Sequence, residues 1–301
     1  MQCLCIGVND CAESVKGYIT NELGKLNKLD IDCFVTDSVD LDGSTSVICT
    51  LNRVEKSTPE YDELVLSVSN GLADYIIEQY EEKLILRIIN SNYCYFNSIE
   101  KKEILKLALL IIKNDDKNFL SSLYQIRRRN IIIRKLIEYF ESSDKVILDG
   151  FVNFRLKDYV KDLEEIVDKA VDDFLTEREY KEFIRLLRYF VDIQEPKFNV
   201  IHVLVDYDSK YILLDEHKRE ITNECIQEFM NDIPEGEINF DDLLVSSLIT
   251  MAPKKVVIHS AKSFRNKELL ETIKNVFWGK AIICPDCELC LVNVARSEKK
   301  S

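Results

Sequence analysis

The spacing of apolar residues changes twice along the chain. Short apolar runs near the start, with helix-spaced apolar residues after the first run, are typical of a small strand-and-helix unit; the runs occupy residues 3–8, 32–35 and 46–51. From Pro59 to Pro196, apolar residues recur every three to four positions, as in amphipathic helices. After Pro196, short strand-like runs return. This pattern predicts an α+β protein.

The middle of the chain predicts a helical bundle with short connections. Thr58 before Pro59 is a helix-start signal, because a hydroxyl group can cap the first turn and proline suits the first helical position. Further helices are expected over residues 98–112, 116–140, 159–175 and 177–191. The clearest apolar face belongs to the third of these, and we expect Phe154 and Phe174 to be buried with it.

The region after Pro196 predicts a mixed sheet. A hairpin is expected over residues 199–205 and 211–214, and helices over 223–231 and 240–250. A strand, a helix and a strand follow over 255–259, 268–277 and 280–284. Such a crossover makes the two strands parallel, so their carboxyl ends meet at one edge of the sheet. We expect three domains: an α+β unit at 1–56, a helical bundle at 57–195 and a C-terminal sheet domain at 196–301.

Composition and charge limit the classes of partner. Hydrophobic residues make up 46% of the 301 residues and charged residues 31%, which is an ordinary globular balance. The net charge of −13 repels phosphate backbones and anionic membrane surfaces. No apolar stretch approaches the roughly 20 residues that a membrane span requires. The sequence therefore favours a protein partner over nucleic acid or a membrane, and it leaves the oligomeric state open.

One dense basic run interrupts the acidic chain. Arg127, Arg128 and Arg129 are consecutive, and Arg134 and Lys135 follow them. Three consecutive side chains on a helix spread over about 200°, so they form no single stripe that could follow a phosphate backbone. We expect these arginines to pair with carboxylates, with anion binding as the alternative.

The ten cysteines favour a reducing compartment. They are scattered through a large acidic chain, which is unlike the dense pattern of a disulfide scaffold. The first residues show neither the basic segment nor the apolar core of a signal peptide. We expect free thiols and a cytoplasmic location.

The strongest chemical signal lies near the C-terminus. Cys284, Cys287 and Cys290 form a CxxCxxC motif, whose two-residue spacers let thiolates converge on one metal ion or cluster. A structural zinc site normally needs a fourth protein ligand. His259 is the best candidate, because the parallel crossover brings it to the strand end that precedes Cys284. Cys225 is a poorer candidate.

Two other interpretations of this motif stay open. The thiols could be redox partners at a strand end, or they could be cysteines of a reducing compartment without a specific role. The possible cofactor is therefore zinc, and the spacing alone does not decide the matter.

Recognisable catalytic motifs are absent. The three histidines lie in no HExxH or comparable frame, and eight glycines in the whole chain leave no glycine-rich phosphate loop. Three aspartates flank the predicted hairpin turn, where such residues usually make local hydrogen bonds and only rarely hold a cation; they are Asp206, Asp208 and Asp215. The sequence favours a protein that is not an enzyme.

Four segments carry a resemblance to a known family; they are 149–159 (DGFVNFRLKDY), 167–172 (VDKAVD), 179–184 (EYKEFI) and 187–191 (LRYFV). Together they resemble the YtxC-like family of sporulation proteins from endospore-forming bacteria, over about residues 85–292. The resemblance implies a bacterial cytoplasmic protein connected with endospore formation. It implies no catalytic residue or cofactor.

Within the first segment, Arg155 stands among apolar neighbours, so we expect a buried ion pair there, with an anion site as the alternative. The leading functional hypothesis is a noncatalytic sporulation protein that acts through macromolecular contacts. A zinc-binding or thiol-redox protein is the second hypothesis. A nucleic-acid-binding regulator is the third.

Overall fold

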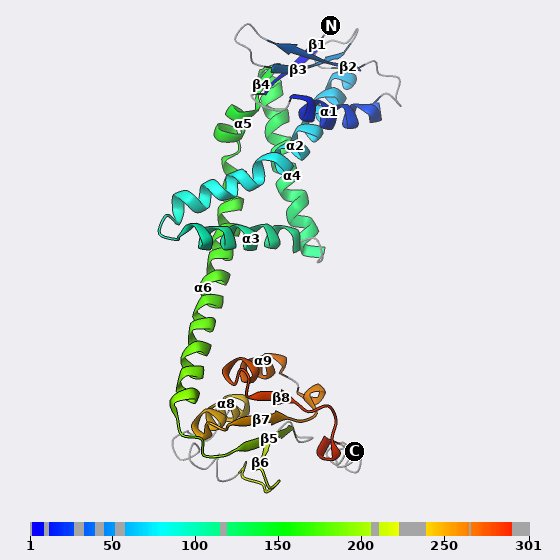
Figure 1. Cartoon of the computed structure of the whole chain (residues 1–301). Helices are drawn as coiled ribbons and strands as arrows, with labels where there is room; N and C mark the ends of the chain where they lie inside the picture. Colours follow the sequence, from blue (N-terminus) through cyan, green and yellow to red (C-terminus); the bar gives the residue numbers. More distant parts are fainter. Residues whose placement is uncertain are drawn as a thin grey trace. The chain divides into compact units, whose positions relative to one another are not determined.

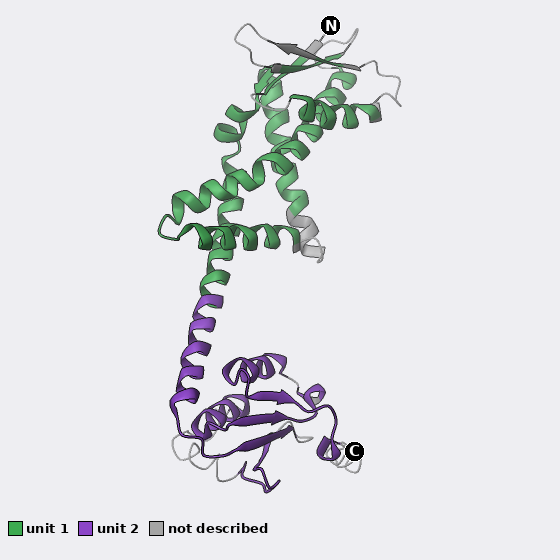
Figure 2. Ribbon diagram, in the orientation of Figure 1, with its two compact units in different colours: residues 1–176 green, residues 177–301 purple. Residues whose placement is uncertain are grey.

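The computed structural model divides the chain into two compact units, residues 1–176 and 177–301, with the boundary inside one long helix (Figure 2). The residues it describes are 2–8, 12–26, 33–39, 45–51, 58–114, 119–205, 211–222, 239–264 and 266–290. Both units contain a small mixed sheet, and the first contains most of the helices (Figure 1). The α+β class expected from the sequence is therefore confirmed.

The sheet of the first unit is formed by β1 (Gln2–Val8), β2 (Cys33–Val39), β3 (Thr45–Leu51) and β4 (Lys145–Ile147). Its strand order is β2-β3-β1-β4. β3 pairs antiparallel with both β1 and β2, whereas β4 returns from the helical region to pair parallel with β1. The strand β4 was not predicted from the sequence, because three residues are too few for a periodic signal.

The helices of the first unit are α1 (Ala12–Leu26), α2 (Pro59–Asn92), α3 (Ser98–Asn114), α4 (Phe119–Ser142), α5 (Leu148–Arg155) and most of α6 (Lys157–Ile193). The Thr58 hydroxyl accepts a hydrogen bond from the Tyr61 N–H at 3.4 Å, which confirms the predicted helix start. Gly71 of α2 packs directly on α1: a Cβ there would lie 3.0 Å from the Tyr18 carbonyl oxygen. One continuous core joins the sheet to the bundle, from Leu4 to Phe174.

The predicted helices at 159–175 and 177–191 are one helix, α6. The sequence between them contains neither glycine nor proline, so nothing stops the hydrogen-bond ladder at Thr176. The predicted three-domain division, 1–56, 57–195 and 196–301, stays a prediction about which parts fold independently.

The basic run on α4 pairs with carboxylates, as expected. Arg129 bonds Asp74 at 2.6 Å, and Arg127 lies 3.9 Å from Asp162. The buried member is Arg128, whose guanidinium lies 3.3 Å from the Glu81 carboxylate. The Tyr159 hydroxyl donates to the same Glu81 oxygen at 2.6 Å, so α2, α4 and α6 meet in one buried polar network. These contacts account for the arginines without a bound phosphate.

The second unit contains a sheet of order β6-β5-β7-β8. Its strands are β5 (Val200–Val205), β6 (Tyr211–Leu214), β7 (Lys255–Ile258) and β8 (Ala281–Ile283), and its helices after α6 are α8 (Phe240–Met251), a short 3-10 turn η3 (Ala261–Ser263) and α9 (Lys267–Val276). The β5–β6 hairpin and the parallel β7–α9–β8 crossover are both confirmed. The helix expected at 223–231 lies outside the described residues.

The expected burial around α5 is only partly correct. Phe174 is buried, and its ring packs edge-to-face on Phe96 with centroids 5.5 Å apart. Phe154, in contrast, is 73% exposed. The reason is a break at Leu156, between α5 and α6, which prevents the apolar face of α6 from extending back through Phe154.

These two phenylalanines provide a matched test of the fold. Phe174→Ala should lower the free energy of unfolding by about 3 to 5 kcal/mol, because it removes a buried ring. Phe154→Ala should change it by no more than about 0.5 kcal/mol. Urea denaturation followed by circular dichroism measures both. Equal effects of the two substitutions would contradict the burial described here.

Candidate metal centre

Parallel pairing brings the four predicted ligands to one edge of the second sheet. His259 directly follows β7, and Cys284 directly follows β8. The register pairs Ile258 with Ile283, and the Cys284 N–H donates to the Ile258 carbonyl oxygen at 2.8 Å. The His259 N–H donates in turn to the carbonyl oxygen of Val203 on β5 at 2.9 Å. The backbone of three strands therefore fixes where the imidazole and the cysteine segment meet.

The ligand atoms of these residues lie close together. The Nδ1 atom of His259 is 3.4 Å from the Cys287 sulfur and 3.5 Å from the Cys290 sulfur. The Cys290 sulfur is 4.0 Å from that of Cys287 and 3.8 Å from that of Cys284. All four ligand atoms lie within 4.8 Å of one another.

Four of these separations are close to those around a tetrahedral zinc ion. With Zn–S bonds of about 2.3 Å and Zn–N bonds of about 2.0 Å, tetrahedral angles place sulfurs about 3.8 Å apart and sulfur and nitrogen about 3.5 Å apart. The sulfur–nitrogen distances of 3.4 and 3.5 Å and the sulfur–sulfur distances of 3.8 and 4.0 Å agree with these values. The donor set could hold such an ion with little rearrangement.

A second histidine orients the first. The Nε2 atom of His259 lies 2.9 Å from Nδ1 of His202, on the neighbouring strand β5. If Nε2 of His259 carries the hydrogen, it donates a hydrogen bond to Nδ1 of His202. The Nδ1 atom of His259 then has no hydrogen, and its lone pair faces the sulfurs. Metal-bound histidines are commonly held by such a hydrogen bond on their other nitrogen.

Burial keeps the central imidazole neutral. His259 is only 2% exposed. Burial, then the neighbouring His202 and Lys218, lowers the pKa of His259 to about 4. Burial also lowers the pKa of His202, with Lys218 adding to the effect. A neutral imidazole is the form that binds metals.

The thiols differ in their tendency to ionise. Burial, followed by hydrogen bonds with the other two cysteines, raises the pKa of Cys284 to about 11. Burial acts in the same direction on Cys290, but hydrogen bonds from the Cys287 backbone and from Ser260 outweigh it and lower the pKa of Cys290. Cys290, which is 3% exposed, therefore supplies a thiolate more readily than Cys284 does.

Two non-glycine residues adopt left-handed backbone conformations beside the cluster. Ser260, directly after His259, has a φ of 48°, and Asp286, between Cys284 and Cys287, has a φ of 76°. Such conformations cost energy for residues other than glycine, and asparagine and aspartate tolerate them best. At Asp286, the tight turn directs the sulfurs of Cys284 and Cys287 toward one point.

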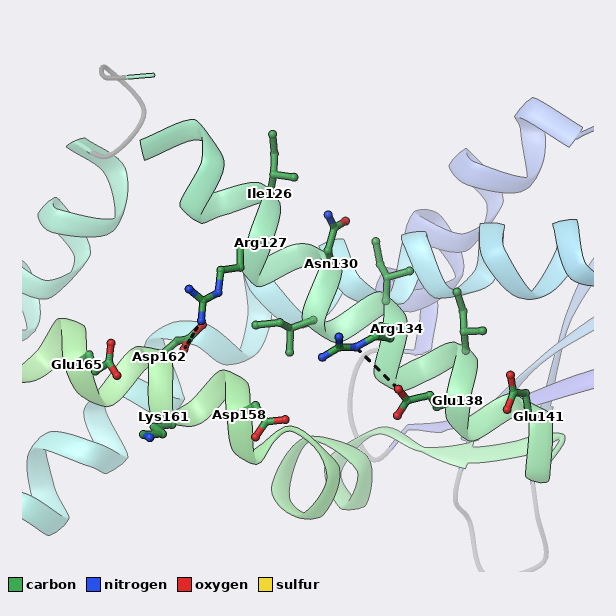
Figure 3. A pocket seen from close by; sticks show the side chains of 13 residues that line it. Ile126, Arg127, Asn130, Arg134, Glu138, Glu141, Asp158, Lys161, Asp162 and Glu165 are labelled. Atoms are coloured by element: carbon green, nitrogen blue, oxygen red, sulfur yellow. Dashed lines mark ion pairs between the residues drawn. The ribbon is translucent and has the colours of Figure 1, made fainter. Parts of the chain in front are cut away.

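A large cleft in the described part of the chain lies elsewhere and shows no comparable convergence (Figure 3). It has a volume of about 1130 Å³ and runs between α4 and α6 in the first unit. Four of its charged side chains form ion pairs: Arg127 lies 3.9 Å from Asp162 across the cleft, and Arg134 lies 3.8 Å from Glu138 along α4. Its lining contains no histidine or cysteine.

Among the other residues singled out in the sequence, those that the structure describes are not assembled into a site. Arg155 is exposed, and its guanidinium lies 5.8 Å from the centre of the Tyr139 ring, so the expected buried ion pair is wrong. Asp215 is buried and accepts hydrogen bonds from the backbone N–H groups of His217 and Arg219, the local role usual for turn aspartates. The remaining candidates, Asp206, Asp208 and Cys225, lie outside the described residues.

The role of His202 was not among the predictions from the sequence. Its signal was present: His202 is the one polar residue in the apolar strand β5 (VIHVLV). The parallel register pairs it with Val257, two residues before His259, so the two imidazoles stand on the same face of the sheet. The pairing of β5 with β7, which reveals this contact, was not predicted.

Comparison with known proteins supplies the family. A model of the YtxC-like family matches residues 66–282, which is well over half of the chain. The chain belongs to the YtxC-like family. A Bacillus subtilis (strain 168) protein named "Uncharacterized protein YtxC" is 26% identical over 237 residues, covering 77% of this chain and 81% of that protein. No solved structure matches the chain.

The family match covers only part of the candidate centre. It includes His202 and His259, the two histidines of the candidate centre in this YtxC-like protein, and ends at Ile282, two residues before Cys284. Independently, no helix within the described residues combines the length and apolar character required to cross a membrane.

The left-handed turn at Asp286 can be tested by substitution. Asp286→Gly should raise the stability of the second unit by up to about 1 kcal/mol, because glycine adopts a φ of 76° without a steric penalty. Asp286→Val should lower it by about 1 to 3 kcal/mol. Thermal unfolding of the full chain measures both. Glu288→Gly is the matched control, and an equal gain there would contradict the argument.

Proposed function

We propose that this YtxC-like protein is noncatalytic and uses Cys284, Cys287, Cys290 and His259 to bind a structural zinc ion. The observation that carries the proposal is the approach of four ligand atoms to within 4.8 Å of one another. Three of these atoms come from one short segment, and the fourth comes from a separate strand end. Local sequence proximity alone does not place an imidazole there.

The donor set favours zinc over other common ions. Three sulfurs and one imidazole nitrogen are soft and borderline ligands, which select zinc or an iron–sulfur centre and disfavour magnesium and calcium. Four protein ligands also fill the tetrahedral positions of zinc. Catalytic zinc sites usually keep one position open for water, whereas structural sites are closed. A closed set of this kind supports a stabilising role over a catalytic one.

The ion would add a further link between two segments of the second unit. β8 has only three residues, Ala281–Ile283, and the cysteine segment follows it directly. A bond network from these sulfurs to His259 would tie that segment to the end of β7. Because metal binding of this kind is coupled to folding, the ion would contribute directly to the stability of the second unit.

The cellular role rests on the family resemblance. That resemblance implies a cytoplasmic protein that takes part in endospore formation. With a closed metal site and no catalytic motif, such a protein acts through contacts with other macromolecules. We propose this role for the present chain, with a protein as the partner.

A thiol-redox function is the second candidate. Cys290 lies 3.8 Å from Cys284 and 4.0 Å from Cys287, sulfur to sulfur, so either neighbour could form a disulfide with it after a small movement. In that case the protein would lose two titratable thiols on mild oxidation and would bind no stoichiometric metal. A nucleic-acid-binding regulator is the third candidate, and it would require affinity for duplex DNA that falls steeply with salt.

Metal analysis of the anaerobically purified, tag-free full chain tests the leading proposal. We expect about one zinc ion per chain. A variant with serine at all three cysteines should contain almost none. Cys94→Ser, at an exposed cysteine of the first unit, is the control and should leave the metal content unchanged. Equal, substoichiometric metal in all three proteins would rule out the site.

The second histidine offers a finer test of the geometry. His202→Phe should weaken zinc binding by about 10- to 100-fold, because the ligand imidazole loses the acceptor that orients it. His202→Gln keeps an acceptor oxygen near the same position and should weaken binding much less. Competition with a zinc-chelating dye measures both affinities. A similar loss in both variants would show that His202 only fills space.

A further inference from the structure

The part of α6 that belongs to the second unit carries an exposed apolar stripe. Phe183, Leu186, Phe190 and Ile193 are each between 49 and 59% exposed. Tyr189 beside them is 60% exposed. Scattered exposed apolar residues are normal on protein surfaces, but a row of them along one helix marks an interaction site.

The stripe is separate from the face that packs on the second unit. Ile184 and Val191 of the same helix are buried in that unit's core. The guanidinium of Arg188 donates to the Asn275 carbonyl oxygen at 2.6 Å, and the Tyr180 hydroxyl lies 3.0 Å from that of Thr272. These contacts fix the rotation of α6 about its axis, so the stripe is an additional apolar face.

The spacing of the stripe is that of a coiled-coil seam. Its four residues follow one another at intervals of three, four and three, which is the alternation of a and d positions in a heptad repeat. No charged residue occupies the seam between Phe183 and Ile193. An apolar stripe with this spacing can pack against a stripe with the same spacing on another helix.

We propose that the stripe pairs with the same stripe of a second copy of this chain, with the two helices antiparallel. A two-fold axis at the level of Arg188, on the stripe side of the helix, places Phe183 opposite Ile193 of the second copy, and Leu186 opposite Phe190 of the second copy. Each layer then contains one aromatic and one aliphatic side chain. Parallel, in-register pairing would instead stack Phe on Phe and Leu on Leu, which gives layers of unequal size.

The size of the stripe sets the strength of this contact. Large apolar side chains bury about 150 to 250 Å² each when fully covered, so five that are half exposed contribute about 500 Å² per copy. The two copies together would bury about 1,000 Å², which lies at the low end for a specific interface. The dimer should therefore be weak and dependent on concentration. This inference does not depend on the metal centre.

Analytical ultracentrifugation of the full chain between about 1 and 200 μM tests the pairing. We expect a monomer–dimer equilibrium within this range. Phe190→Glu should raise the dimer dissociation constant by about 100-fold or more, because each dimer then contains two charges in its seam. Phe154→Glu, at an exposed phenylalanine of the first unit, should leave it unchanged. A monomer at every concentration would overturn the proposal, as would equal effects of the two variants.

A photo-crosslinking experiment tests the orientation. Benzoylphenylalanine at position 190 should crosslink mainly near Leu186 of the second copy, and at position 183 mainly near Ile193. Crosslinks between identical positions would overturn the antiparallel arrangement. Zinc content measured on the same samples should not change with Phe190→Glu, so failure of this inference and failure of the metal site can be told apart.

Discussion

A single backbone hydrogen bond brings the candidate metal ligands of this protein to one edge of a sheet. The Cys284 N–H donates to the Ile258 carbonyl oxygen, and this bond continues the parallel ladder between β7 and β8 by one residue beyond the end of β8. Parallel strands end at the same edge of a sheet, so the residues that follow them become neighbours. An antiparallel pair would have carried His259 and Cys284 to opposite edges, and the cysteine motif would have had only three ligands.

The candidate site was largely accessible from sequence because it follows from this topological rule. A strand–helix–strand order predicts parallel strands, and His259 and the CxxCxxC motif stand at their carboxyl ends. The orientation of the imidazole was not accessible, because it depends on His202 of β5. Periodicity within a strand shows which residues share a face, but it does not show which strand will be its neighbour.

The errors around α5 and α6 have a different origin. Helical periodicity identifies an apolar face only while the helix continues, and the break at Leu156 changes the direction in which Phe154 and Arg155 point. Farther along, α6 has two apolar faces, of which one is buried and one is exposed. A sequence pattern cannot say which of two apolar faces a particular fold will cover. The pairing of the arginine run was easier to predict, because three consecutive side chains spread around α4 and therefore need separate partners.

The separation of the ligands along the chain has a consequence for how the second unit would assemble. The three cysteines are neighbours in sequence, whereas His259 precedes them by the whole length of α9. An unfolded chain could therefore capture an ion loosely with its sulfurs alone. The imidazole would join only after α9 had formed and β8 had docked beside β7. The fourth ligand would then bind only after the strand–helix–strand unit had folded, so the metal would stabilise a late step of folding.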